Sequence, residues 1–331
     1  MDIGIVNYSI YLPEKFETAA EVADRAGLTV EEVIDLGIER KNKPCKEDQP
    51  VTMAVRAAVQ VLERAEGVTP DDIDLVIWTG EEYKDYIAQT AAIRLQEEVG
   101  CRNGWAFDLV GQSVTFIQGL RVARDIMVGD DSVNTVLLAG GARNVDLVDY
   151  ANPHTRFLLA TSASGGAIII RRGHKKNLLL NTAFSVHPEM ADEVYVPGGG
   201  TEHPFSPENL NSTIMYFQVF NPEIIAEYFS ARWAGALAET AKKALKGKRP
   251  DYLALRHLAP VHLRQVLEEL GLTDQQSASL AGWGHHGVND VLISLDLGLK
   301  SGAVRDGSLV GMVSGGIGFS YAAAAIRWGS V

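Results

Sequence analysis

The feature of this sequence that most constrains its fold is a repeated alternation of short apolar segments with longer amphipathic ones. Residues 74–79, Asp-Leu-Val-Ile-Trp-Thr, have the composition of a buried strand, and residues 49–65 before them carry apolar side chains at helical spacing. The alternation continues to the end of the chain. Such patterns are typical of α/β proteins whose sheets are buried between helices. We therefore predict an α/β fold.

The second half of the chain repeats the pattern of the first. Lys248-Arg249-Pro250-Asp251-Tyr252-Leu253-Ala254-Leu255 echoes Thr69-Pro70-Asp71-Asp72-Ile73-Asp74-Leu75-Val76-Ile77, and in both a helix is followed by a Pro-Asp turn and an apolar strand. A chain of 331 residues is long enough for two core-forming halves. We therefore predict a duplicated βα unit, divided into residues 1–172 and 173–331.

The same patterns place the other elements. One segment, 185–218, lacks a clear period and is interpreted as an insertion or as a loop that covers the active site. Further strands are expected at 3–11, 105–109, 135–141, at the apolar end of 158–170, at 278–283 and at 308–314, and helices at 18–25, 29–36, 88–99, 222–245, 262–270 and 288–300.

Charge and composition exclude several function classes. The formal net charge is −12 and no cluster of Lys and Arg reverses it, so a nucleic-acid groove is not expected. No apolar run approaches the roughly 20 residues that span a bilayer, and the N-terminus reads as a first strand. Cys45 and Cys101 have no partners at metal-ligand spacing, so no metal site is expected, and both fit free thiols in a reducing cytoplasm.

Ser113 is the strongest candidate for a nucleophile. It follows a short apolar strand pattern at 105–109 and directly precedes a helical pattern that begins at Val114. At such a junction the side chain is lifted from the sheet, and the free N–H groups and positive dipole end of the helix lie behind it.

Histidines supply two further candidates. His257 lies just past a strand end, where functional groups of open α/β sheets collect. His285 and His286 lie between glycines in Gly-Trp-Gly-His-His-Gly, and adjacent residues do not both face one point, so we expect at most one of them in the site.

Two more segments at predicted strand ends carry chemistry. Glu81 and Glu82 follow the strand at 74–79, and one such carboxylate is suited to general base catalysis. Ser314-Gly-Gly-Ile-Gly-Phe319 is a glycine turn after a strand, and backbone N–H groups in such a turn can form an oxyanion hole.

Taken together, these segments resemble the branch of the thiolase superfamily that contains ketoacyl synthase III and 3-hydroxy-3-methylglutaryl-CoA synthase, over nearly the whole chain. The resemblance implies a thiolase fold, in which two similar βαβαβ halves stack as a five-layer α-β-α-β-α sandwich, normally in a homodimer. It is carried by Ile5 to Pro13, Gly37-Ile38-Glu39-Arg40-Lys41, Ala106-Phe107-Asp108, the Ser-Gly-Gly-Ala stretch at Ser164, the His257 turn and the glycine turn at Ser314.

The resemblance also implies roles for the candidate residues. The family's nucleophilic cysteine falls on Ser113 and its histidine on His257. Its second polar residue, often asparagine, falls on His285, or on His286 or Asn289 if a gap is allowed. The oxyanion hole would be the backbone N–H groups of Ser113 and Ile317, and the family's glutamate falls on Glu81.

The activity implied is that of a cytoplasmic acyltransferase or condensing enzyme of fatty acid or polyketide biosynthesis. Its substrates would be acyl-CoA or acyl-carrier-protein thioesters, with CoA or phosphopantetheine as carrier and no bound cofactor. Serine in place of cysteine leaves two alternatives: a non-catalytic subunit that supports a ketosynthase-like partner, or a Cys→Ser variant that traps an acyl complex. A simple serine hydrolase is a third and weaker idea, because Gly-Gln-Ser-Val-Thr lacks the second glycine of the hydrolase motif and no Asp or Glu is evident behind the histidine.

Overall fold

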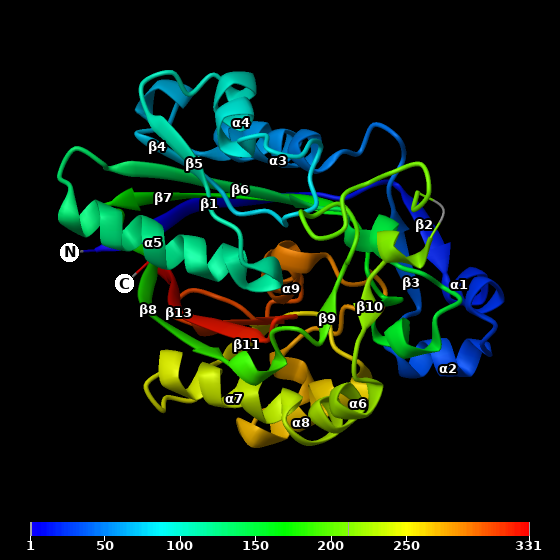
Figure 1. Cartoon of the computed structure of the whole chain (residues 1–331). Coiled ribbons are helices and arrows are strands. Elements are labelled where there is room, and N and C mark those ends of the chain that lie inside the picture. Colours follow the sequence, from blue (N-terminus) through cyan, green and yellow to red (C-terminus); the bar gives the residue numbers. More distant parts are fainter. Residues whose placement is uncertain (1, 211, 331) are drawn as a thin grey trace.

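The protein is built from stacked sheets with helices above, between and below them. The computed structural model describes residues 2–210 and 212–330, and Figure 1 shows the layers from the side. The main strands are β1 (Ile3–Tyr11), β4 (Leu75–Trp78), β5 (Trp105–Asp108), β6 (Thr135–Ala142), β7 (Ser164–Arg172), β8 (Lys176–Val186), β11 (Tyr252–Leu255), β12 (Leu309–Gly316) and β13 (Ser320–Ser330). Two small pairs are formed by β2 (Lys15–Thr18) with β3 (Arg40–Lys43) and by β9 (Val194–Tyr195) with β10 (Gln218–Val219).

The main strands pair in the order β11-β12-β13-β8-β1-β7-β6-β4-β5. β1 and β8 meet through the pair Gly4 and Leu178, where one sheet passes into the other. On each side of this junction the pairings run antiparallel, antiparallel and parallel, from β1 through β7 and β6 to β4 and from β8 through β13 and β12 to β11. This is the duplicated unit that the sequence echo predicts, while the boundary at residues 172 and 173 stays a prediction.

Helices complete the five-layer sandwich (Figure 1). α3 (Pro50–Arg64) and α4 (Ala91–Val99) cover the outer face of the first sheet, and α7 (Trp233–Ala244) with α8 (Pro260–Glu269) covers the outer face of the second. α5 (Thr115–Gly129) and α9 (Asp290–Lys300) lie between the sheets. Three apolar cores stabilise the stack: one between α3, α4 and the first sheet, one in the central layer around α5 and α9, and one between the second sheet, α7 and α8.

Small residues let α3 approach the first sheet closely. A Cβ atom added at Gly165 would lie 2.0 Å from the Met53 carbonyl oxygen, and one added at Gly141 would lie 2.0 Å from that of Pro50. The small residues at the start of β7 therefore allow the backbones of β7 and α3 to approach closely, as the composition of the Ser-Gly-Gly-Ala stretch predicts.

Several sequence predictions need correction. The single helix expected at 222–245 is two helices, α6 (Pro222–Ala231) and α7, because the backbone leaves helical geometry at Arg232. Residues 278–283 are not a strand but end in a turn, since the N–H groups of Trp283 and Gly284 both donate to the Leu280 carbonyl. The strand β8 had no predicted counterpart. The helices expected at 18–25 and 29–36 are α1 (Ala19–Ala26) and α2 (Val30–Asp35), each with a threonine capping box.

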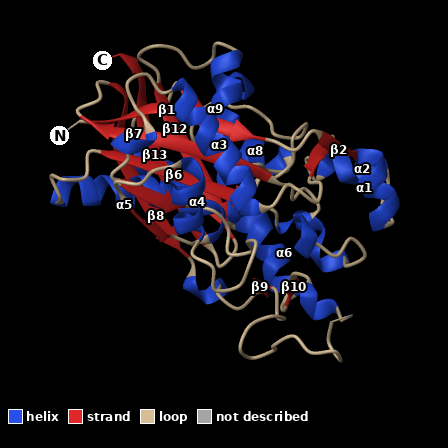
Figure 2. Cartoon of the chain, turned by 90° about the horizontal axis from the view of Figure 1, so that it is seen from above, coloured by secondary structure: helices blue, strands red, loops and turns tan. Residues whose placement is uncertain are grey.

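The segment between β8 and β10 lies beside α6 at one side of the molecule, and Figure 2 shows its loop projecting from the sheets. Its last part carries Phe217 toward the centre of the protein, where the side chain is buried. Among the described residues, no helix is both long and apolar enough to cross a bilayer.

Candidate active site

Ser113 lies at the junction that its sequence context predicts. β5 ends at Asp108, and a 3-10 turn over Gln112–Val114 leads directly into α5. Gln112 has a positive φ of 58°, a strained conformation for a residue with a side chain, and this strain lies immediately before Ser113. The Ser314 hydroxyl donates to the Ser113 carbonyl at 2.7 Å and ties the turn to β12. Ser113 is thus held at the meeting point of the two sheets.

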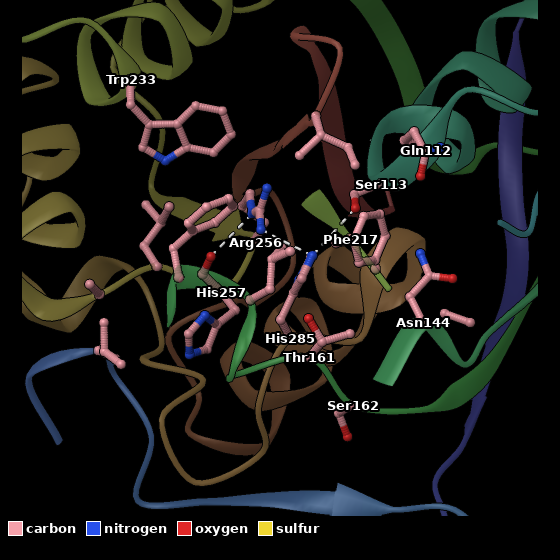
Figure 3. Close-up of a pocket in the computed structure, with 18 of the residues that line it drawn as sticks. Gln112, Ser113, Asn144, Thr161, Ser162, Phe217, Trp233, Arg256, His257 and His285 are labelled. Carbon is pink, nitrogen blue, oxygen red and sulfur yellow. Dashed lines mark hydrogen bonds between the residues drawn. The ribbon is translucent and has the colours of Figure 1, made fainter. Parts of the chain in front are cut away.

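His285 contacts the Ser113 hydroxyl. Its Nε2 lies 3.3 Å from Ser113 Oγ (Figure 3). Two backbone hydrogen bonds fix His285 against residues 160–162. Its N–H donates to the Ala160 carbonyl at 2.7 Å, and its carbonyl accepts from the Ser162 N–H at 2.8 Å. It is thus the ring of His285, and not that of His257, that contacts the Ser113 hydroxyl.

Asp290 lies behind His285. His285 Nδ1 is 2.5 Å from Asp290 Oδ2, and the other oxygen of the carboxylate accepts from the His286 N–H at 2.7 Å. The sequence-based statement that no acidic residue stands behind the histidine was therefore wrong. Asp290 opens α9, and the turn before this helix brings its side chain back to a residue five positions earlier, which spacing alone does not reveal.

The charges of this group suit proton transfer. Burial, reinforced by the Arg256 charge, lowers the pKa of His285, so the ring is neutral at pH 7. Burial opposes ionisation of Asp290, but the nearby histidine and arginine hold its pKa well below the usual range. A carboxylate only accepts, so Nδ1 of His285 carries the proton and the lone pair of Nε2 faces Ser113. Serine, neutral histidine and aspartate stand in the order that activates a hydroxyl.

His257 lines the same cavity with a different hydrogen bond. Its Nε2 donates to the Gly37 carbonyl at 2.8 Å, and its backbone N–H donates to Asp290 Oδ2 at 2.9 Å. Burial lowers the pKa of His257 to about 4, so this ring is also neutral at pH 7. His257 thereby helps to orient Asp290 and presents a neutral ring to the cavity.

Arg256 was not predicted from the sequence. It follows β11, and one terminal nitrogen lies 3.0 Å from His285 Nε2. The guanidinium lies between Trp233 and His285 in the centre of the cavity (Figure 3). No sequence motif points to Arg256, because an arginine after a strand is most often a solvated surface residue.

Glu81 and Glu82 have opposite environments. Glu81 is completely buried, and the Ser113 hydroxyl lies 3.5 Å from its Oε1. Burial raises the pKa of Glu81 to about 7, and its Oε2 has no hydrogen-bond partner among the described residues. Glu82 is exposed. Of the two carboxylates that follow β4, the structure thus brings Glu81 alone to the site.

The glycine turn packs directly on the nucleophile turn. A Cβ atom at Gly316 would lie 3.2 Å from the Ser113 backbone nitrogen, so glycine permits this approach. Ile317 lines the cavity next to Ser113. Whether the N–H groups of Ser113 and Ile317 form an oxyanion hole stays a prediction.

The alternatives for the third catalytic position are placed apart. The two ring nitrogens of His286 lie 3.0 and 2.9 Å from the Ala163 and Trp283 carbonyl oxygens. Asn289 donates to the Gly140 carbonyl at 3.2 Å and to Ser164. Both side chains are buried in backbone contacts, so His285 is the one of the three that lines the cavity.

The cavity has a volume of about 210 Å³ and joins the candidate residues to an apolar chamber. Glu81, Ser113, His257, His285 and Ile317, which lie on five separate segments of the chain, all line it. Most of the remaining wall is aromatic or aliphatic, from Leu36, Phe157, Leu158, Phe217, Phe229, Trp233, Leu258 and Phe319. In residues 2–210 and 212–330 no group of three His, Cys, Asp or Glu residues is arranged to hold a metal ion.

The two similar sheets, with a buried serine at the start of a central helix between them, define a thiolase-fold enzyme. The chain belongs to the 3-oxoacyl-[acyl-carrier-protein] synthase III family. The family model for that synthase matches residues 107–188, and the model for its C-terminal part matches residues 240–328.

Individual relatives agree along the whole chain. The β-ketoacyl-[acyl-carrier-protein] synthase III of Symbiobacterium thermophilum is 26% identical over 99% of this chain and 98% of its own. The crystal structure of 3-oxoacyl-(acyl carrier protein) synthase III from Pseudomonas aeruginosa is 19% identical and superposes with a TM-score of 0.85 over 100% of this chain and 99% of its own. A Cys→Ser variant of OleA from Xanthomonas campestris, with bound lauric acid and lauroyl-CoA, is 16% identical, with a TM-score of 0.82 over 99% of both chains.

Proposed function

We propose that this protein transfers acyl groups from a thioester carrier through an ester on Ser113. The single observation that carries the proposal is the chain of contacts from Ser113 Oγ to His285 Nε2 at 3.3 Å and from His285 Nδ1 to Asp290 at 2.5 Å. Relatives of the family are named for synthesis on acyl carrier protein, and one structural neighbour holds an acyl-CoA. We therefore infer acyl-CoA or acyl carrier protein as the donor.

The chemical step follows from the protonation states. Ser113 Oγ bonds to the thioester carbonyl carbon while its proton passes to His285 Nε2, and Asp290 stabilises the imidazolium that forms. The carbon–sulfur bond then breaks, and the departing sulfur takes the proton from His285. The acyl group is left on Ser113 as an ester. An acceptor hydroxyl, amine or thiol, deprotonated by the same nitrogen, attacks the ester in the second half-reaction and restores Ser113.

Other residues are assigned supporting roles. His257 and the backbone N–H groups of Ser113 and Ile317 would stabilise the oxyanion of the tetrahedral intermediate. Glu81, whose pKa near 7 leaves it partly protonated, would exchange a proton with the acceptor or the acyl group. The family's condensing reaction requires an enolate to attack the bound acyl group, and an oxygen ester is less activated toward that attack than a thioester. Serine at this position therefore favours transfer over condensation.

We infer that the protein works as a homodimer in the cytoplasm. β5 is the last strand in the sheet order, and Trp105 on it is 50% exposed. An edge strand with exposed aromatic side chains is suited to pairing with a second copy of the chain. Both cysteines of the described chain are free thiols, as a reducing compartment favours.

Thiol release tests the proposal. The protein is incubated with a panel of acyl-CoAs and a nucleophilic acceptor, and free CoA is measured for the wild type, Ser113→Ala and Ser113→Cys. We expect Ser113→Ala to lose release above background and Ser113→Cys to retain it. A supporting subunit of another ketosynthase would instead release no CoA by itself, and its complex would be insensitive to Ser113→Ala.

A further inference from the structure

Arg256 holds a positive charge inside the candidate active site. Its Nε donates to the His257 carbonyl at 3.1 Å, one terminal nitrogen donates to the Gly315 carbonyl, and the other lies 3.0 Å from His285 Nε2. All three acceptors are uncharged: two are backbone carbonyl oxygens, and the third is a nitrogen of the neutral His285 ring. A guanidinium carries five N–H groups, so a further N–H remains on each of its two terminal nitrogens.

No carboxylate of the described chain forms an ion pair with Arg256. Asp290 is near enough to favour the guanidinium charge, but its oxygens accept from the His257, His285 and His286 N–H groups. Glu81 is also near, but its raised pKa leaves it partly neutral. Arg256 is half-buried, and a half-buried cation without a contacting anion is costly, so a ligand that supplies a carboxylate would lower this cost.

The surroundings of Arg256 restrict what such a ligand can be. The guanidinium carbon lies 5.2 Å from the centre of the Trp233 ring, and Phe229 and Phe319 continue the apolar wall of the cavity. Arg256 and Ser113 both contact the same nitrogen of His285. An anionic group recognised here is therefore only a short distance from the carbon that Ser113 attacks.

We propose that Arg256 binds a carboxylate on the acyl group itself, so that the preferred donor is a short dicarboxylic acyl thioester of the malonyl type. This inference rests on the proposed function of Ser113 as acyl acceptor. The paired terminal N–H groups of a guanidinium match the two oxygens of a carboxylate. A thioester with a plain alkyl chain offers Arg256 no such partner.

The same contact links recognition to reactivity. In the structure the Arg256 N–H and the Ser113 O–H share the lone pair of His285 Nε2. A bound carboxylate is a stronger acceptor than a neutral ring, so the guanidinium shifts toward it and away from His285 Nε2. The His285 lone pair is then left to Ser113, so a donor with a carboxylate prepares the base that its own transfer requires.

Matched acyl-CoAs test the proposal on the full-length protein. Malonyl-CoA is compared with isovaleryl-CoA, which has the same shape with two methyl groups in place of the carboxylate oxygens, and the rate of Ser113 ester formation is followed by intact-protein mass. We expect the wild type to react about tenfold or more faster with malonyl-CoA. Arg256→Gln is expected to remove this preference, Arg256→Lys to restore part of it, and Arg232→Gln, at an exposed arginine, to leave it unchanged. An unchanged ratio in Arg256→Gln, or a wild type that prefers isovaleryl-CoA, would overturn the proposal.

Binding measurements on a variant without the Ser113 hydroxyl test the role of Arg256 independently of the proposed function. In Ser113→Ala, calorimetric titration with the two acyl-CoAs is expected to show about tenfold tighter binding of malonyl-CoA, and the double variant with Arg256→Gln is expected to lose the difference. If no thioester forms an ester on Ser113, the proposed function fails and this titration alone decides the role of Arg256. Equal affinities for the two compounds in Ser113→Ala would then refute it.

Discussion

Ser113 depends on its neighbours more than a cysteine at the same position would. A hydroxyl is a weak nucleophile at neutral pH unless a base takes its proton, whereas a thiol is already partly ionised. In the proposed reaction His285 supplies that base, and Asp290 holds the proton of the ring on the nitrogen that faces away from Ser113. Asp290 is therefore as necessary to the proposed reaction as Ser113.

Asp290→Asn is expected to slow ester formation on Ser113 by roughly a thousandfold, because an amide in this position favours the wrong tautomer of His285. The rate is measured by time-resolved intact-protein mass, with circular dichroism to verify the fold. Asp125→Asn, at an exposed carboxylate on α5, serves as the control and should react like the wild type. Undiminished acylation in Asp290→Asn would remove Asp290 from the mechanism.

Glu81 makes stability depend on pH. Burial raises its pKa from 4.5 to about 7, so the folded state holds a proton that the unfolded chain releases at lower pH. The resulting stability is fully present below pH 4.5 and is lost as the pH rises through about 7, an effect on the order of 3 kcal/mol. Glutamine cannot ionise, so the melting temperature of Glu81→Gln should rise relative to that of the wild type as the pH increases from about 5 to about 8, across the folded pKa of Glu81.

The control for this pH series is Glu82→Gln, which changes the exposed neighbour. Its melting temperature should follow that of the wild type at every pH. Parallel curves for Glu81→Gln and the wild type would show that Glu81 does not hold a proton in the folded protein.

The residues that sequence reasoning found and missed differ in a physical way. Ser113 and His285 lie next to backbone signals, a strand-to-helix junction and a pair of flanking glycines, which are visible locally. Asp290 and Arg256 both contact His285 through side chains that reach across turns. Their roles depend on side-chain direction in the folded protein, which residue type and spacing do not encode.

At the scale of elements, the turn before α9 has a strict requirement for glycine at position 287. Gly287 has a φ of +58°, and a Cβ atom there would lie 2.3 Å from Glu81 Oε1. This turn sets the positions of His285 and Asp290 against Glu81. The pattern at 288–300 predicts the helix but not the buried turn that begins it, and the apolar spacing at 278–283 imitates a strand where the chain turns instead.

Alanine substitutions at two glycines distinguish the cost of backbone strain from the cost of steric crowding. Gly302 has a φ of +74° with nothing within 4 Å of an added Cβ, so Gly302→Ala should cost about 1 kcal/mol in the free energy of unfolding. Gly287→Ala adds a collision with Glu81 and should cost about 2 kcal/mol more. Denaturant titrations measure both values. Equal losses in the two variants would mean that the Glu81 contact is not tight.

At the scale of the whole molecule, the alternating pattern and the sequence echo were sufficient to predict the α/β class and its duplication. They did not reveal β8 or the pairing of Gly4 with Leu178 that joins the sheets. That contact links residues far apart in sequence, and its register is set by packing on both faces rather than by local composition.

The exposed edge strand β5 predicts association of two copies of the chain. We expect sedimentation velocity at micromolar concentration to show a dimer, and Trp105→Lys to shift it to a monomer, because a buried lysine at a sheet edge opposes pairing. Val128→Lys, at an exposed position on α5 (56%), should leave the dimer intact. A monomeric wild type would contradict this assembly.

The identity of the acylated atom is the most direct measurement of the central claim. The wild type is incubated with malonyl-CoA or acetyl-CoA, quenched in acid and digested, and the modified peptide is sequenced by tandem mass spectrometry. We predict an acyl ester on Ser113 that hydroxylamine removes, absent in Ser113→Ala and strongly reduced in His285→Ala. Acyl transfer that proceeds with Ser113 unmodified, or an adduct on another residue, would contradict it.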